Sequence, residues 1–169
     1  ADLAKAAAAS PYAVFDNAGQ DCCARSRILV EASAYDEFMA LLEPAVTGFR
    51  CEDPARETAE MGPLISAQQR DLVASYVDAA EVAFRGSAPS GPGYWFPPTV
   101  LTAKSTQDPH WREEIFGPVV SVLPFADEAE AIRLANDTEY GLSGSIWTRD
   151  LGRGIRVARG VDTGNLSVN

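Results

Sequence analysis

The residue of this chain whose setting best suits covalent chemistry is a cysteine on a glycine-containing turn. Cys22 lies within residues 17–27, after an alanine-rich stretch that favours a helix and before the apolar residues 28–30 that favour a strand. A thiolate attacks a carbonyl carbon well only where the sulfur is reachable and the anion is favoured. The turn makes Cys22 reachable, whereas we interpret Cys51 as a buried apolar filler, the commoner role of a free cysteine. Asp21 places a carboxylate beside the candidate nucleophile, which tends to raise a thiol pKa.

Two stretches of the sequence resemble signatures of one enzyme family. Residues 17–27 resemble the active-site cysteine motif of the NAD(P)-dependent aldehyde dehydrogenases, and residues 113–119 (Glu-Glu-Ile-Phe-Gly-Pro-Val) resemble that family's second signature. Position within the first motif selects Cys22 over Cys23, because the family's nucleophile sits two residues after the Gly-Gln pair. The resemblance extends over essentially the whole chain, through three further segments in family order, residues 93–101, 134–142 and 164–169.

The resemblance implies a reaction at Cys22. In this family the cysteine adds to an aldehyde to give a thiohemiacetal, hydride passes to NAD(P)+, and water hydrolyses the resulting thioester to a carboxylic acid. Each step develops an oxyanion, and backbone N–H groups aimed at that oxygen lower the barrier. The amide of Cys22 is the expected donor from this chain. The resemblance also implies a second donor from an asparagine side chain and a glutamate base for water, both before the first residue here.

The second signature carries the expected contacts with the cofactor. By resemblance, Glu114 holds the nicotinamide ribose and Phe116 contacts the nicotinamide side of the cofactor, which is NAD or NADP, with NAD favoured as the commoner case. Gln69 aligns with a position that approaches the cofactor in some family members. The sequence contains neither a P-loop nor a GxGxxG motif. We therefore expect residues 1–169 to be a single catalytic domain, a fragment without the main dinucleotide-binding domain and the oligomerisation extension.

The order of apolar and helical segments predicts an α/β fold, an open, largely parallel twisted sheet flanked by helices, which is Rossmann-like. Residues 119–125 and 28–30 read as strands, and residues 165–168 as a last strand. The pattern predicts a helix from position 67 to 83 capped by Ser66, and helices that begin after Ser33 and Asp127.

Composition and charge exclude several classes of partner. The 169 residues carry a formal net charge of −10, with a pI of about 4.5, the opposite of the basic surface that a nucleic acid needs. No apolar run approaches the roughly 20 residues that span a bilayer. Three cysteines give no complete disulfide set, and their spacing matches no zinc site, so we expect no metal and a reducing, cytoplasmic setting. The expected partners are a small-molecule aldehyde and, by resemblance, further copies of the chain in a dimer or tetramer.

Two other functions remain open from the sequence. Cys22 and the only histidine, His110, could form the nucleophile and base of a thiol (thio)esterase. Alternatively, the chain could be a non-catalytic interaction module from a truncated paralogue.

Overall fold

The computed structural model describes residues 1–169 and is built around an open sheet of four strands with the order β1-β4-β3-β2. β4 pairs in parallel with β1 and with β3, whereas β2 pairs antiparallel with β3. The mostly parallel sheet confirms the predicted α/β class. The strands are β1 (Arg27–Glu31), β2 (Glu81–Arg85), β3 (Thr99–Thr102) and β4 (Val119–Phe125).

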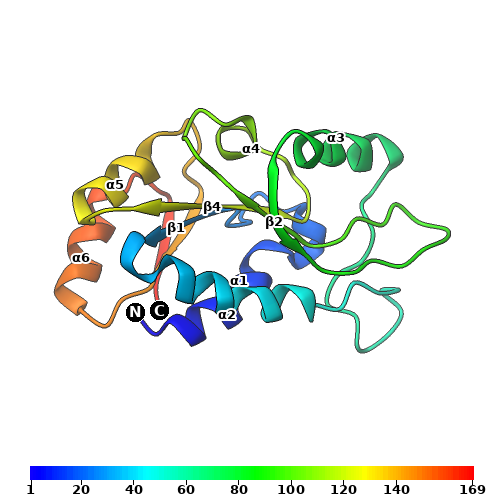
Figure 1. Ribbon diagram of the computed structural model, residues 1–169, viewed down its shortest axis with the longest axis horizontal. Helices are drawn as coiled ribbons and strands as arrows, with labels where there is room; N and C mark the ends of the chain where they lie inside the picture. The colour runs from blue at the N-terminus through cyan, green and yellow to red at the C-terminus, as the bar shows by residue number, and fades with distance from the viewer.

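Helices cover both faces of this sheet, as Figure 1 shows. Two lie on one face, α1 (Leu3–Val14) and α2 (Tyr35–Thr47), and two on the other, α3 (Ala67–Asp78) and α4 (Pro109–Arg112). β4 is central, and its first five residues are buried. A strand buried on both faces needs a continuous apolar run rather than an alternating one, which is why the sequence Val-Val-Ser-Val-Leu forms it.

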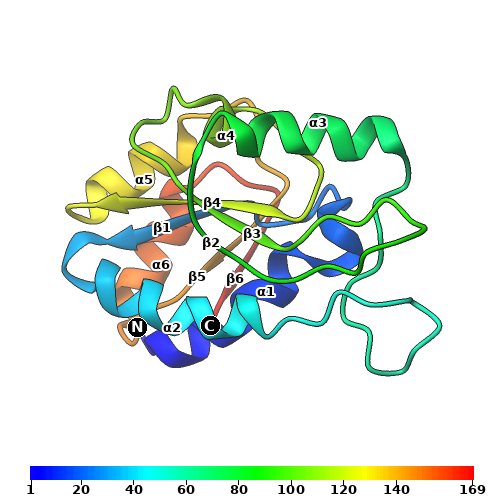
Figure 2. The same ribbon diagram turned by 45° about the vertical axis from the view of Figure 1, so that its right-hand side comes forward.

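A smaller sheet stands apart from the first (Figure 2). It consists of two parallel strands, β5 (Ser143–Ile146) and β6 (Asn165–Val168), with α5 (Glu128–Asn136) and α6 (Leu151–Gly160) beside it. Asn136 ties the two helices together: its Nδ2 donates to the carbonyl of Gly160 at 2.8 Å, and its Oδ1 accepts from the amide of Asp162 at 2.9 Å. The predicted last strand is therefore present, with β5 as its partner.

The helix caps follow the sequence at two of three positions. The side chain of Ser66 accepts from the amide of Gln69, and that of Asp127 accepts from the amide of Glu130, as predicted. Ser33 is not a cap, because it lies inside a short 3₁₀ helix (Ala32–Ala34) and α2 begins only at Tyr35.

The helix predicted over residues 67–83 is too long. α3 ends at Asp78, and residues 81–85 form β2 instead. Their side chains alternate between exposed and half-buried, and their backbone pairs with β3, so tertiary pairing overrides the local helical pattern. Only Val73 and Val77 are fully buried in α3, and Leu72 is 45% exposed.

Candidate active site

The loop that presents Cys22 reverses direction through three consecutive left-handed residues. After α1, the chain forms a short 3₁₀ helix (Asp16–Gly19) in which Asn17, Ala18 and Gly19 have φ of 51°, 56° and 68°. Such angles disfavour residues with a Cβ, and a side-chain hydrogen bond from Asn17 Nδ2 to the carbonyl of Gln20 at 2.9 Å holds the turn. Cys22 follows on an exposed turn, so its sulfur is reachable as predicted.

The two signature segments touch at Gly19. A Cβ built on Gly19 would lie 2.0 Å from the carbonyl oxygen of Gly117 and 2.4 Å from its carbonyl carbon. No side chain fits between two backbones at this separation, and the left-handed φ also favours glycine. The glycine of the first signature thus allows the cysteine loop to pack directly on the second signature.

The N-terminal end of α3 holds both segments from one side. Gln20 of the cysteine loop accepts a hydrogen bond from the amide of Ile65 at 3.1 Å. In the first turn of the helix, Gln69 Nε2 donates to the carbonyls of Ile115 and Phe116, at 3.0 and 2.9 Å. The resemblance predicts that Gln69 approaches the cofactor. In the structure, its side-chain amide is hydrogen-bonded to the backbone of the second signature.

Phe116 is held in an unusual conformation. Its φ is 55°, a left-handed value that is uncommon for an aromatic residue, and its side chain is 38% exposed. Such a conformation persists where neighbouring groups over-determine it. The two hydrogen bonds from Gln69 supply this restraint at the backbone of Ile115 and Phe116, next to the Gly117 that packs on Gly19.

Replacing Gln69 with leucine is therefore expected to loosen the second signature. The loss of one part-buried and one exposed hydrogen bond costs about 1–3 kcal/mol of unfolding free energy, and amides 115–117 become faster in hydrogen exchange. Gln68→Leu is the matched control, since Gln68 is exposed and its side chain makes no hydrogen bond. Equal exchange at residues 115–117 in both variants contradicts a restraining role for Gln69.

The two members of the acidic pair have different surroundings. Tyr76 of α3 donates a hydrogen bond of 2.5 Å to Glu113 Oε2, and this bond raises the pKa of Tyr76 to about 12. Glu114 is exposed, and its carboxylate makes no hydrogen bond or ion pair. Both glutamates line one cavity together with Cys22. Glu114 is thus the free acceptor of the pair.

Neighbouring groups oppose ionisation of Cys22. A hydrogen bond with Cys23 is the main cause that raises the pKa of the Cys22 thiol, and the charge of Asp21 adds to it. The ligand atoms of Asp21, Cys22 and Cys23 lie within 4.8 Å of one another, so a negative charge on Cys22 meets one carboxylate and a second sulfur. The Cys22 backbone N–H donates to no group of the chain, which leaves it available to an oxyanion.

Replacing Cys23 with alanine is expected to speed alkylation of Cys22 at pH 7. Loss of the main group that raises the pKa increases the thiolate fraction, so we expect Cys22 to be alkylated faster in the variant than in the unmodified chain. Mass mapping after limiting iodoacetamide measures it. Cys51 is the internal control, because it is buried and burial raises its pKa to about 11. Labelling of Cys51 before Cys22 contradicts a nucleophile at position 22.

His110 does not join this site. It is buried on α4, where its Nδ1 lies 2.9 Å from Ser121 Oγ in β4, and Ser121 Oγ in turn donates to the His110 carbonyl. Burial lowers the pKa of His110. His110 is not among the residues that line the cavity beside Cys22, so its ring serves the packing of α4 on the sheet.

Comparison with known proteins agrees with these features. The model of the aldehyde dehydrogenase family matches residues 1–169, so the chain belongs to the aldehyde dehydrogenase family. It is 38% identical to the 5-carboxymethyl-2-hydroxymuconate semialdehyde dehydrogenase of Escherichia coli, over all of this chain and 38% of that protein. It is also 38% identical to a chloroplastic betaine aldehyde dehydrogenase of Atriplex hortensis, over 94% of this chain and 33% of that protein.

Solved structures of the family share the fold. The crystal structure of a betaine aldehyde dehydrogenase from Staphylococcus aureus in complex with NAD+ superimposes with a TM-score of 0.93 at 37% identity, over 99% of this chain and 35% of that one. An NAD-dependent aldehyde dehydrogenase from Sinorhizobium meliloti gives 0.95 at 36% identity, over 99% of this chain and 34% of that one. The chain thus spans about a third of the length of these relatives. None of its helices has the length and apolar character needed to cross a bilayer.

Proposed function

We propose that this chain is the nucleophile-bearing part of an NAD(P)-dependent aldehyde dehydrogenase that converts an aldehyde to a carboxylic acid. One observation supports this most strongly. The exposed Cys22, with its free backbone N–H, lies on a loop that packs through Gly19 onto the segment carrying Glu114 and Phe116. A nucleophile, an oxyanion donor and the proposed cofactor contacts are therefore carried by two segments that pack directly against each other.

Each residue has a defined task in the proposed reaction. The Cys22 thiolate attacks the aldehyde carbon, and its backbone N–H stabilises the oxyanion that forms. Glu114 offers an unpaired carboxylate to ribose hydroxyls, and Phe116 presents an exposed ring to the nicotinamide face. These residues fit NAD or NADP, which, when bound, accepts the hydride from the substrate carbon. NAD is favoured as the commoner case.

The raised pKa of Cys22 bears on how the nucleophile is activated. At neutral pH the thiol is mostly protonated in this environment, so attack needs a group that takes its proton or stabilises the thiolate. His110 is engaged with Ser121 and does not line the same cavity. The geometry therefore disfavours a self-contained thiol esterase built from Cys22 and His110. We propose instead that the base comes from another part of a longer polypeptide, which acts in the cytoplasm as a homo-oligomer.

The isolated chain is expected not to oxidise aldehydes at a useful rate. Positioning of cofactor and base supplies much of the barrier lowering, and we assign both to the remainder of the polypeptide. The assay is nicotinamide reduction with short and aromatic aldehydes, in which the full-length polypeptide turns over and the 169-residue chain does not. Robust turnover by the isolated chain contradicts the proposed placement of the base.

A further inference from the structure

Three residues of α3 that share one side of the helix contact the second signature at three places. Gln69, Val73 and Tyr76 are four and three residues apart, a spacing that puts them on the same side of a helix, which we call the signature-facing side of α3. The contacts of Gln69 are its two hydrogen bonds to backbone carbonyls. Val73 packs so closely on the segment that a Cβ built on Gly117 would lie 2.4 Å from the Val73 Cγ2.

The third contact holds the first member of the acidic pair. The backbone N–H of Glu113 already donates to the carbonyl of Pro109 at 2.9 Å, and Tyr76 fixes its side chain through the hydrogen bond of 2.5 Å to Oε2. This bond is the main cause that raises the pKa of Tyr76 to about 12, so the phenol stays protonated, as a donor must, throughout the neutral range. A phenylalanine has the same ring but cannot make the bond, so the hydroxyl is the group that acts on Glu113.

Glu114 makes no hydrogen bond of its own that fixes its position. Its carboxylate has no partner, and neither its backbone N–H nor its C=O pairs with another group. Tyr76 holds the carboxylate of Glu113, which precedes it. Gln69 holds the carbonyl of Ile115, which follows it. The position of Glu114 is therefore set through its two neighbours in the chain, and both are anchored to α3.

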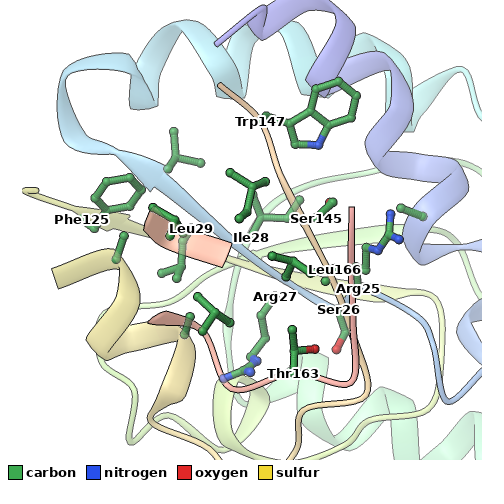
Figure 3. A pocket seen from close by; sticks show the side chains of 18 of the residues that line it. Arg25, Ser26, Arg27, Ile28, Leu29, Phe125, Ser145, Trp147, Thr163 and Leu166 are labelled. Atoms are coloured by element: carbon green, nitrogen blue, oxygen red, sulfur yellow. The ribbon is translucent and has the colours of Figure 1, made fainter. Parts of the chain in front are cut away.

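The hold on Glu113 matters because both carboxylates border the same space. Glu113 and Glu114 line one cavity of about 820 Å³ together with Cys22, and Figure 3 shows Leu29 of β1 and Ser145 of β5 on its other walls. Two adjacent carboxylates repel each other and can compete for the same hydroxyl groups of a ligand. None of the three residues on the signature-facing side of α3 lines this cavity. They therefore act from outside it, and occupy one carboxylate while the other stays free.

We propose that the signature-facing side of α3 positions Glu114 for cofactor binding, and that Tyr76 is a positioning residue that acts by holding Glu113. The inference rests on the proposed function, in which Glu114 binds the ribose hydroxyls of NAD or NADP. Because the residues on either side of Glu114 are held before the cofactor arrives, the free carboxylate is presented in one arrangement. Such preorganisation raises affinity, since less conformational freedom is lost on binding.

Removing the Tyr76 hydroxyl from the full-length polypeptide tests this inference. We expect Tyr76→Phe to raise the dissociation constant of the cofactor that the polypeptide reduces, NAD or NADP, by at least about fivefold. The kcat at saturating cofactor and the KM of the aldehyde change by less than about twofold, because Tyr76 lies outside the cavity that Cys22 lines. Tyr94→Phe is the matched control, since Tyr94 is 41% exposed and its hydroxyl makes no hydrogen bond. Unchanged cofactor affinity in Tyr76→Phe overturns the inference, and so does an equal loss in the control.

Variants of Glu113 test the same bond from its other end. Glu113→Gln keeps an oxygen that can accept from Tyr76, whereas Glu113→Leu keeps the approximate size without the acceptor. We expect the leucine variant to lose cofactor affinity as Tyr76→Phe does, and the glutamine variant to recover it to within about twofold of the unchanged polypeptide. Equal cofactor affinities in the two Glu113 variants contradict the inference.

A double variant separates a positioning role from a general loss of stability. Glu114→Ala removes the carboxylate that the proposed function places on the ribose, and we expect it to weaken cofactor binding by at least about tenfold. If Tyr76 acts through Glu114, adding Tyr76→Phe to Glu114→Ala weakens binding by less than about a further twofold, whereas independent effects multiply. Multiplied losses overturn the inference and leave the cofactor role of Glu114 intact. Unchanged cofactor affinity in Glu114→Ala overturns that role and the inference together.

Discussion

The Cys22→Ala variant of the full-length polypeptide is expected to lose aldehyde oxidation by at least about 10³-fold in kcat. Without the thiol no covalent adduct forms, and the remaining groups can only bind and polarise the substrate. The loss should appear in kcat with little change in the dissociation constant of the cofactor, because Glu114 and Phe116 lie on a different segment. Steady-state nicotinamide reduction and cofactor titration measure the two quantities separately.

Cys23→Ala is the matched control for this experiment. Cys23 is also exposed and adjacent, so the control removes a thiol of the same kind from the same turn. We expect it to keep most of the activity and to react faster with alkylating agents. Full activity of the Cys22→Ala variant, or loss of activity only in the Cys23→Ala variant, contradicts the assignment of the nucleophile.

Features encoded by a few neighbouring residues could be predicted from the sequence. The continuous apolar run of β4 identified a central buried strand, and Ser66 and Asp127 marked the starts of α3 and α5. The glycine turn before Cys22 likewise predicted an exposed thiol, and Cys51 was correctly assigned to the core. In each case the signal and the structure depend on the same short stretch of chain.

Features that depend on distant partners could not be predicted. Residues 81–85 form a strand because they pair with β3. Their own sequence continues the helical pattern and does not indicate this pairing. The role of Gln69 depends on two carbonyls more than 40 residues away in the chain. The different surroundings of Glu113 and Glu114 depend on Tyr76, which lies 37 residues before Glu113 in the chain. The sequence around a polar residue on a helix does not indicate which distant residue will be its hydrogen-bond partner.

The candidate site is held together by contacts between segments rather than by any one segment. Gly19 packs on Gly117, Gln20 binds the amide of Ile65, and Gln69 binds the backbone beside Phe116. The cysteine loop and the second signature are thus fixed to each other directly and through the start of α3. Displacement of either segment is expected to move the nucleophile relative to Glu114, because these contacts and the pairing of β1 with β4 together set their separation.

The closest of these contacts is that of Gly19 with the backbone of Gly117. Gly19→Ala is expected to lower the unfolding free energy of the 169-residue chain by more than about 4 kcal/mol, because the new Cβ meets the Gly117 backbone and the φ of 68° disfavours alanine. Urea unfolding followed by tryptophan fluorescence measures the loss. Gly91→Ala is the control: its φ of 113° is also positive, but a Cβ there meets nothing within 4 Å, so the backbone cost alone remains, about 1–2 kcal/mol. Equal losses in the two variants would mean that the two signature segments are not packed against each other in solution.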